Sequence, residues 1–256
     1  MASADHIRLA DRQIDAVSRW ADIMPTVSLV IPTMNEERNV GNVLARIPDW
    51  VTEVILVDGL STDRTVPLAR ALRPDVKIIM ETNPGKGSAL TAGFRAATGE
   101  IIAALDADGS MDPAELHTFV GQLVAGADYV KGSRFVQGGG TVDMELHRRM
   151  GNWGLMMAAK VLFGGHYSDL CYGYFAFWRD ALPLLNPDVP GFEIETQINV
   201  RALKAKLKIA EVPSFEERRL HGVSNLKAWR DGFRILRTIV KERFTPLELP
   251  PVIDLR

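Results

Sequence analysis

The segment Ile101-Ile102-Ala103-Ala104-Leu105-Asp106-Ala107-Asp108-Gly109 combines a strand pattern with a candidate site. Its first five residues are apolar, which is typical of a strand buried on both faces of a sheet. Two carboxylates follow at positions i and i+2, and the glycine after them favours a tight turn. The segment therefore predicts a buried parallel strand with Asp106 and Asp108 at its carboxyl end.

Similar apolar runs alternate with helical patterns along the first half of the chain. We expect strands at Val27–Ile31, Glu53–Val57, Val76–Met80 and Ile101–Leu105, and helices at Glu36–Arg46, Asp63–Ala71 and Gly87–Ala97. In the less regular second half we expect strands at Ala127–Lys131, Tyr174–Trp178 and Lys208–Val212, and helices at His147–Phe163 and Glu195–Ala205. This alternation predicts an α/β fold with a single, mostly parallel, twisted sheet and helices on both faces.

The composition fits one globular domain with an extension at each end. The chain has 256 residues, of which 46% are hydrophobic and 24% are charged. We divide it into a helical appendage at 1–25, a main domain at 26–225 and a basic amphipathic helix with a tail at 226–256. The single cysteine, Cys171, excludes an internal disulfide, and a reducing cytoplasm fits best.

Charge and hydrophobicity restrict the partners. A net charge of -2 gives no general attraction to nucleic acid, so we expect none as a partner. The longest apolar stretch, Trp153–Gly165, contains Lys160 and is shorter than the ~18 to 20 residues of a membrane span. In Leu226–Phe244, apolar residues form one stripe with basic residues beside it. Such a helix either packs against the domain or makes peripheral contact with the inner face of a membrane.

Asp106 and Asp108 are the candidate metal ligands. Carboxylate oxygens suit Mg²⁺ or Mn²⁺, with water and substrate phosphates completing the shell. An isolated Asp-x-Asp has a simpler interpretation, a turn in which Asp108 and Gly109 lead into the next helix. Position favours a site, because Pro32–Glu36 and Asp58 follow two other predicted strands. The carboxyl ends of parallel strands share one edge, where ligands collect.

Four motifs occur in order along this edge: Pro32–Glu36, Val57-Asp58 through Asp63, Asn83-Pro84-Gly85-Lys86-Gly87, and Asp106-Ala107-Asp108. With them the chain resembles the family 2 inverting glycosyltransferases, and more narrowly the polyprenyl-phosphate glycosyltransferases, the group that includes dolichyl-phosphate mannose synthase. The resemblance runs from about Val27 to Arg243. It implies a GT-A fold, a UDP-glucose-like or GDP-mannose-like donor, a divalent metal and inversion at the anomeric carbon. Members of that group often continue into membrane spans, which we do not expect here.

The resemblance assigns the nucleotide-sugar site to Pro32, Asn35, Glu36, Asp58, Lys86, Asp106 and Asp108. In that assignment Asp58 contacts the base or ribose, Asp108 is the direct metal ligand, and Asp106 is shared between metal-bound water and the nucleotide. Lys86 opens a predicted helix, whose amino-terminal end suits phosphate. One departure is Gly59, which stands where the family usually has a second aspartate, and this leaves the base identity open.

In the second half, the resemblance implies that Arg134, Arg219 and Asp169 are catalytic and that Glu193, Glu195 and Ser224 lie on the acceptor side. Arg219 begins an Arg-x-x-Gly-x-Ser-Lys element in which Asn225 replaces the usual lysine. Simpler interpretations are surface arginines, an Asp169 that caps a helix or pairs with an arginine, and glutamates that stabilise a helix amino terminus. The run Gly138-Gly139-Gly140 predicts a mobile segment around residues 136–146.

The acceptor decides whether a protein base is needed. A phosphate monoester, with a second pKa of ~6, is already anionic at neutral pH, whereas a hydroxyl is not. We expect Asp169 to act as the base for a hydroxyl acceptor or to orient a lipid phosphate. The favoured function is transfer of a hexose to a polyprenyl phosphate. The alternatives are a soluble small-molecule acceptor and a non-catalytic nucleotide-sugar-binding module.

Two other enzyme classes lack their signatures. A sugar nucleotidyltransferase needs a glycine-rich, arginine-bearing loop after the first strand, where this chain has Pro32–Glu36. A dinucleotide oxidoreductase needs Gly-x-Gly-x-x-Gly at the same place, and this motif is missing. The intact Asp106, Asp108 and Arg219 also argue against a module without turnover.

Overall fold

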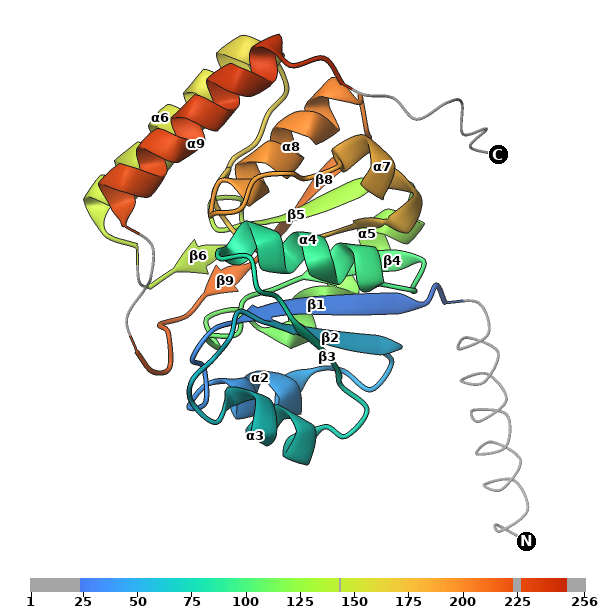
Figure 1. The fold of residues 1–256 in the computed structure, drawn as a ribbon. Helices are drawn as coiled ribbons and strands as arrows, with labels where there is room; N and C mark the ends of the chain where they lie inside the picture. The colour runs from blue at the N-terminus through green and yellow to red at the C-terminus, as the bar shows by residue number, and fades with distance from the viewer. Residues whose placement is uncertain (1–23, 143, 223–226, 248–256) are drawn as a thin grey trace, which may run out of the picture.

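A computed structural model describes residues 24–142, 144–222 and 227–247 (Figure 1). Most of the predicted appendage at 1–25 therefore lies outside the described residues, as do Ser224 and the end of the tail. The described chain forms a seven-stranded sheet in the order β3-β2-β1-β4-β7-β5-β8, with helices on both faces. The predicted α/β class is confirmed.

The first half supplies four parallel strands. They are β1 (Val27–Thr33), β2 (Glu53–Asp58), β3 (Lys77–Met80) and β4 (Ile101–Ala104). The helices between them are α2 (Val40–Arg46), α3 (Thr65–Leu72) and α4 (Lys86–Ala96). Strand β1 pairs with both β2 and β4, and its last residue, Thr33, lies opposite Asp58. The predicted motifs therefore share one edge of the sheet.

The second half completes the sheet with β5 (Tyr129–Ser133), β7 (Phe175–Trp178) and β8 (Ile209–Pro213). Strand β7 runs antiparallel between β4 and β5, so the sheet is mostly rather than fully parallel. The helices are α5 (Leu116–Val124), α6 (Leu146–Phe163), α7 (Leu182–Leu185), α8 (Ile194–Lys204) and α9 (Ala228–Phe244). Short 3-10 turns, η1 (Pro113–Glu115) and η2 (Arg179–Ala181), precede α5 and α7.

Two hydrophobic layers enclose the sheet, which explains the apolar strand sequences. On one face, alternate residues such as Leu29 and Leu56 pack with α2, α3 and α5. On the other face, Val30 and Val57 pack with α4 and α8. A Cβ atom on Gly93 would lie 2.3 Å from Val30 Cγ1, so this glycine allows α4 to approach the sheet closely. That approach holds the start of α4 at the carboxyl edge.

A second, two-stranded sheet consists of β6 (Gly140–Thr141) and β9 (Phe215–Glu216), which pair in parallel. The sequence analysis predicted neither strand and treated the glycine run as a loop. The glycines permit close backbone packing: a Cβ on Gly139 would lie 2.3 Å from the Ser133 carbonyl oxygen. Figure 1 shows this small sheet beside the ends of the central strands. It lies next to the predicted acceptor side.

Helices α6 and α9 lie side by side along one flank of the molecule (Figure 1). The helix predicted at Leu226–Phe244 is present as α9, and its buried residues Ile235 and Ile239 join the core. Within the described ranges, no helix is both long and apolar enough to cross a membrane. The two helices instead expose much of their apolar surface.

Candidate active site

The loops that follow β1 and β2 are joined by hydrogen bonds through Ser61. Asp58 is fully buried, and its carboxylate accepts hydrogen bonds from the Ser61 backbone N–H at 2.7 Å and from the Ser61 hydroxyl at 2.6 Å. The same hydroxyl accepts from the Asn35 backbone N–H at 2.8 Å. Asn35 adopts a left-handed conformation with φ 57° and receives the Thr62 N–H on its Oδ1 atom. Pro32, Asn35 and Asp58 are thus brought together, as predicted for a nucleotide-binding edge.

A second cluster joins Glu36, Asp108 and Arg219. The Arg219 guanidinium contacts the Glu36 carboxylate, and its Nη1 atom lies 4.0 Å from Asp108 Oδ2. Burial raises the pKa of Glu36, while hydrogen bonding from Asn39 and the charge of Arg219 oppose that effect. The other Asp108 oxygen accepts from Ser110 N at 2.9 Å and from Ser110 Oγ at 2.7 Å. Predicted residues from both halves of the chain therefore meet at this edge.

Lys86 lies between two carboxylates. Its ammonium nitrogen is 2.5 Å from Asp106 Oδ1 and 2.6 Å from Glu195 Oε1. Burial would lower the pKa of Lys86, but these two carboxylates raise it above its usual value. Burial raises the pKa of Asp106 to about 6, against the effect of Lys86. Glu195, predicted on the acceptor side, thus contacts Lys86, which was predicted to bind the nucleotide sugar, and the role of Glu195 stays a prediction.

Two close approaches shape the surroundings of Lys86. A Cβ atom on Gly173 would lie 2.8 Å from Glu195 Oε1 and 2.9 Å from Lys86 Nζ. At the start of α4, the Gly87 N–H donates to the Pro190 carbonyl at 2.8 Å, and the next N–H donates to the same oxygen. Two of the first amides of α4 therefore already have a protein partner, and phosphate binding at this helix end stays a prediction. The Lys86 side chain at this helix end is itself paired with Asp106 and Glu195.

Arg134 and Asp169 form a buried, bidentate ion pair. Arg134 Nε lies 2.6 Å from Asp169 Oδ2, and Nη2 lies 2.9 Å from Oδ1. Burial alone would raise the pKa of Asp169, but Arg134, aided by Lys131, holds it below its usual range. A general base needs an oxygen that can reach the substrate proton. Both Asp169 oxygens accept hydrogen bonds from Arg134, so of the two predicted roles, base or orienting group, the geometry favours the orienting role.

A second carboxylate, Glu216, also contacts Arg134, and the sequence analysis did not predict it. Arg134 Nη1 donates to Glu216 Oε2 at 3.0 Å, and the guanidinium carbon lies 4.8 Å from the centre of the Tyr172 ring. A guanidinium has five N–H donors. Three are taken by Asp169 and Glu216 among the described residues, so two remain for a ligand.

Arg134 lines a cavity of about 750 Å³ between α6 and α9. The apolar walls come from Met144, Met150, Leu155, Trp229, Phe233, Ile235 and Leu236. The polar groups are few and mostly basic or neutral, namely Arg134, His147, Arg148 and Asn152. Cys171 also lines this cavity, and burial raises the pKa of its thiol to about 12. The thiol is therefore protonated at neutral pH, which argues against a nucleophilic role.

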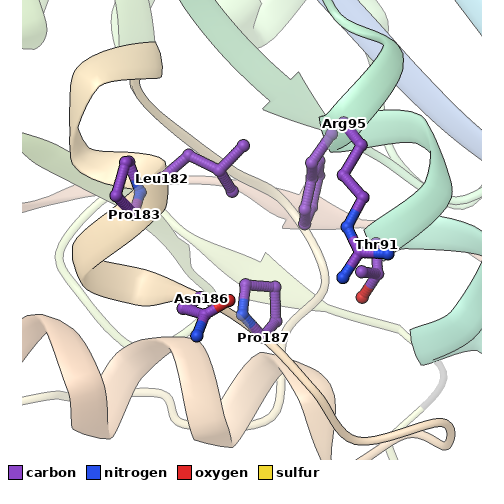
Figure 2. A pocket seen from close by; sticks show the side chains of 7 residues that line it. Thr91, Arg95, Leu182, Pro183, Asn186 and Pro187 are labelled. Carbon is purple, nitrogen blue, oxygen red and sulfur yellow. The ribbon is translucent and has the colours of Figure 1, made fainter. Parts of the chain in front are cut away.

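A smaller hollow of about 180 Å³ lies between the later part of α4 and α7 (Figure 2). Its lining consists of Thr91, Phe94, Arg95, Leu182, Pro183, Asn186 and Pro187. None of these residues was predicted to be functional, and Arg95 is the one titratable side chain among them. The larger cavity is therefore the better candidate for a substrate.

The two remaining acceptor-side predictions have different outcomes. Glu193 is buried at the start of α8, and its Oε2 atom has no hydrogen-bond partner among the described residues. It does not contact Arg134 in the described hydrogen bonds, so its acceptor role stays a prediction. Ser224 lies outside the described residues.

The carboxylates near Lys86 fit a metal only if substrate completes the site. Among the residues that the structure describes, no three or more His, Cys, Asp or Glu side chains are grouped to hold a metal ion. Asp106 and Asp108 supply hard oxygen donors, which suit Mg²⁺ or Mn²⁺. Such ions commonly keep only one or two protein carboxylates and take the other ligands from water and phosphates. The donor set is therefore compatible with the predicted cofactor.

Comparison with known proteins agrees with this arrangement. The model of glycosyl transferase family 2 matches residues 28–184. The dolichol-phosphate mannosyltransferase of Pyrococcus furiosus is 30% identical over 84% of this chain and 63% of its own length. The undecaprenyl-phosphate mannosyltransferase of Micrococcus luteus is 33% identical over 76% of this chain and 85% of its own length. This chain thus spans less than two thirds of the first relative.

Among solved structures, a close match is glucosyl-3-phosphoglycerate synthase from Mycobacterium tuberculosis in complex with Mn²⁺, UDP-glucose and phosphoglyceric acid. The TM-score is 0.71 at 25% identity, covering 88% of this chain and 82% of that chain. The expected GT-A-like sheet is therefore confirmed. With the family model covering more than half of its residues, this chain belongs to glycosyl transferase family 2.

Proposed function

We propose that the protein transfers a hexose, with inversion, from a nucleoside-diphosphate sugar to a polyprenyl phosphate. The observation that carries this proposal is the setting of Arg134. Its guanidinium is fixed by two carboxylates, keeps two donors for a ligand, and lines a largely apolar cavity. A phosphate attached to a long apolar chain matches both features.

The donor would bind at the carboxyl edge of β1, β2 and β4. Asp108, with Asp106, would hold the divalent cation, which neutralises diphosphate charge when bound. Lys86 lies beside Asp106 and supplies a further positive charge for the leaving diphosphate. Asn35 and Asp58 lie on the same edge, where the nucleoside would rest. The base and the sugar stay open, since Gly59 replaces the second aspartate usual in the family.

A phosphate acceptor also agrees with the Asp169 geometry. With a second pKa of ~6, a phosphate monoester is a nucleophile at neutral pH without a protein base. Asp169 is fully buried and bound to Arg134 through both oxygens. Its role in this proposal is to orient Arg134 toward the acceptor phosphate. A hydroxyl acceptor would require a base that this site does not offer at Asp169.

The outer surface of α6 and α9 supports an acceptor held in a membrane. The large apolar side chains exposed there are Leu146, Met150, Trp153, Val161, Trp229, Phe233, Leu236, Val240 and Phe244. Exposed basic residues accompany them on both helices, among them Arg149, Lys160, Arg230, Arg234, Arg237 and Lys241. Apolar and basic side chains on one surface are suited to an anionic lipid interface. This surface is continuous with the cavity that Arg134 lines, because Met150, Trp229, Phe233 and Leu236 belong to both.

A soluble phosphorylated acceptor is the second candidate. The M. tuberculosis synthase is named for glucosyl transfer to phosphoglycerate and was solved with phosphoglyceric acid. The two bacterial and archaeal mannosyltransferases are named for polyprenyl-type phosphates. Both acceptor classes carry a phosphate for Arg134. The apolar cavity walls favour the lipid, because phosphoglyceric acid has no apolar chain to bury there.

The test is transfer with a panel of donors and acceptors. UDP-glucose and GDP-mannose are supplied with Mg²⁺ or Mn²⁺, together with either undecaprenyl phosphate in vesicles or phosphoglyceric acid. We expect metal-dependent release of nucleoside diphosphate and a glycosylated lipid with one donor. Product with phosphoglyceric acid alone would favour the second candidate. Nucleotide-sugar binding without any product would indicate a non-catalytic module.

A further inference from the structure

A short segment, Phe215–His221, connects the two parts of the site and is named here the linking segment. At its start, Glu216 contacts Arg134 on the acceptor side. Three residues later, Arg219 contacts Glu36 and approaches Asp108 on the donor side. One stretch of backbone therefore carries a charged contact to each half of the site.

The acceptor end of the linking segment is held by the small sheet. Glu216 Oε2 accepts from the Thr141 hydroxyl at 2.6 Å in addition to Arg134 Nη1 at 3.0 Å. Thr141 lies opposite Glu216 in the β6–β9 pair, and the Val142 N–H donates to the Glu216 carbonyl at 3.1 Å. The Glu216 carboxylate is thus fixed by its own strand and fixes Arg134 in turn.

The donor end lies directly on the turn that holds Asp108. The Glu217 N–H donates to the Ser110 carbonyl at 2.9 Å, and the Leu220 N–H donates to the Asp108 carbonyl at 3.2 Å. Gly109 has φ +79°, and a Cβ there would lie 2.6 Å from Leu220 Cδ1. The turn and the linking segment are in close contact, so a displacement of one displaces the other.

We propose that Glu216 is a positioning residue for Arg134 and that the linking segment couples donor binding to acceptor binding. This inference rests on the proposed function. Asp169 fixes the plane of the guanidinium, and Glu216 holds its far nitrogen. Binding of a donor and cation at Asp108 moves or tightens the turn, and the linking segment transmits this change to Glu216. Each ligand then alters the affinity for the other by the same factor.

A kinetic experiment tests the positioning role, because it shows whether removal of Glu216 raises or lowers the acceptor KM. Glu216→Ala is compared with Glu217→Ala, which removes the same charge from the adjacent, exposed residue. Loss of a charge-assisted hydrogen bond is expected to raise the acceptor KM about tenfold in Glu216→Ala. The donor KM, measured at an acceptor concentration far below the acceptor KM, should stay unchanged, because the coupling acts only when both ligands are bound. Glu216→Gln retains an acceptor oxygen and should recover part of the loss. An acceptor KM that is unchanged or lower in Glu216→Ala overturns the positioning role, because removal of a negative charge alone favours phosphate.

A binding experiment tests the coupling and separates its failure from that of the proposed function. The affinity of dodecyl phosphate is measured by calorimetry with and without Mg²⁺ and a nucleoside diphosphate, using UDP and GDP in turn. We expect a change of at least about fivefold in the wild type and in Glu217→Ala, and none in Glu216→Ala. Equal changes in all three proteins overturn the coupling alone. Absence of dodecyl phosphate binding by the wild type overturns the proposed acceptor and the coupling with it.

Discussion

The donor edge and the acceptor side of this protein are built in different ways. At the donor edge, Asn35 and Asp58 stand at or just after the ends of strands, and hydrogen bonds such as Asp58 to Ser61 span three residues. On the acceptor side, Arg134 meets Asp169 from 35 positions away and Glu216 from 82 positions away. Parallel topology alone gathers the first set, whereas the second depends on the packing of the whole second half.

This difference predicts in which of the two regions a substitution lowers the stability of the fold. At the donor edge, the candidate metal ligands Asp106 and Asp108 are half-buried carboxylates that a cation or substrate would complete. The acceptor side uses a fully compensated, buried ion pair, in which loss of one partner leaves the other charge buried. We therefore expect donor-edge variants to lose activity while remaining folded, and acceptor-side variants to lose stability as well.

The largest expected effect is at Asp108. Asp108→Ala removes the carboxylate predicted to bind the cation, and we expect transfer to fall by about a thousandfold or more. The melting temperature should stay close to that of the wild type, because among the described residues the Asp108 carboxylate contacts its local turn and Arg219. The matched control is Asp49→Ala, at an exposed aspartate. Full activity of Asp108→Ala would remove this residue from the site.

The second-largest effect is expected on the stability of an acceptor-side variant, Asp169→Asn. Asp169→Asn should destabilise the fold by about 3 kcal/mol at neutral pH, because Arg134 is left buried without its ionic partner. The folded-state pKa of Asp169 lies below its usual value, so its ionised form contributes stability above the unfolded pKa of about 3.9. That contribution is lost as the pH falls through the folded-state pKa. The difference in unfolding free energy between wild type and variant should therefore shrink below about pH 4.

The same variant also separates the two roles of Asp169. If Asp169 orients Arg134, Asp169→Asn raises the acceptor KM and leaves the shape of the pH–rate profile unchanged. If it were the general base, kcat would fall by about a hundredfold or more and the acidic limb of the profile would disappear. Kinetics at saturating donor across pH 5 to 9 distinguish the two outcomes.

The sequence predicted most of the fold because the strands are buried on both faces. Continuous apolar runs such as Ile101–Leu105 and punctuating polar motifs located β1 to β4 within one or two residues. The pair of strands β6 and β9 was not predicted, because two-residue strands are too short to show an alternating hydrophobic pattern. Helix α5 was also not expected, although Leu116, Phe119, Val120 and Leu123 have helical spacing and are buried.

The candidate site, like the fold, was predicted where it depends on strand ends and not where it depends on contacts between distant segments. The nucleotide-site residues lie together because strand ends define a shared edge, a rule that needs no tertiary detail. The contact between Glu195 and Lys86 was not predicted, because it depends on how α8 lies against the start of α4. Glu216 was missed altogether, since only the pairing of β6 with β9 brings it to Arg134. Contacts between distant segments leave no local sequence pattern from which they could be predicted.

A moderate effect is expected where the two regions meet, at Gly173. A Cβ atom there would press on the Lys86 and Glu195 side chains, so Gly173→Ala should separate this ion pair and raise the donor KM about tenfold. The acceptor affinity should change little. Gly121→Ala is the control, because a Cβ on this helical glycine meets nothing within 4 Å. An unchanged donor KM in Gly173→Ala would show that the ion pair is not needed for donor binding.

The smallest effect on the protein itself is expected on the exposed face of α9. Phe244 is 82% exposed, so Phe244→Ser should leave the fold and the catalytic centre intact. If this face rests on lipid, the variant loses one apolar side chain from the interface, and affinity for anionic vesicles falls about tenfold. Leu72→Ser is the matched control, since Leu72 is 59% exposed on α3, which covers the other face of the sheet. Vesicle sedimentation and transfer to undecaprenyl phosphate should decline together in Phe244→Ser, while transfer to dodecyl phosphate in solution stays at the wild-type rate. Equal vesicle binding by both variants would place the acceptor chain in the cavity without a membrane contact through α9, and would shift the balance toward a soluble acceptor.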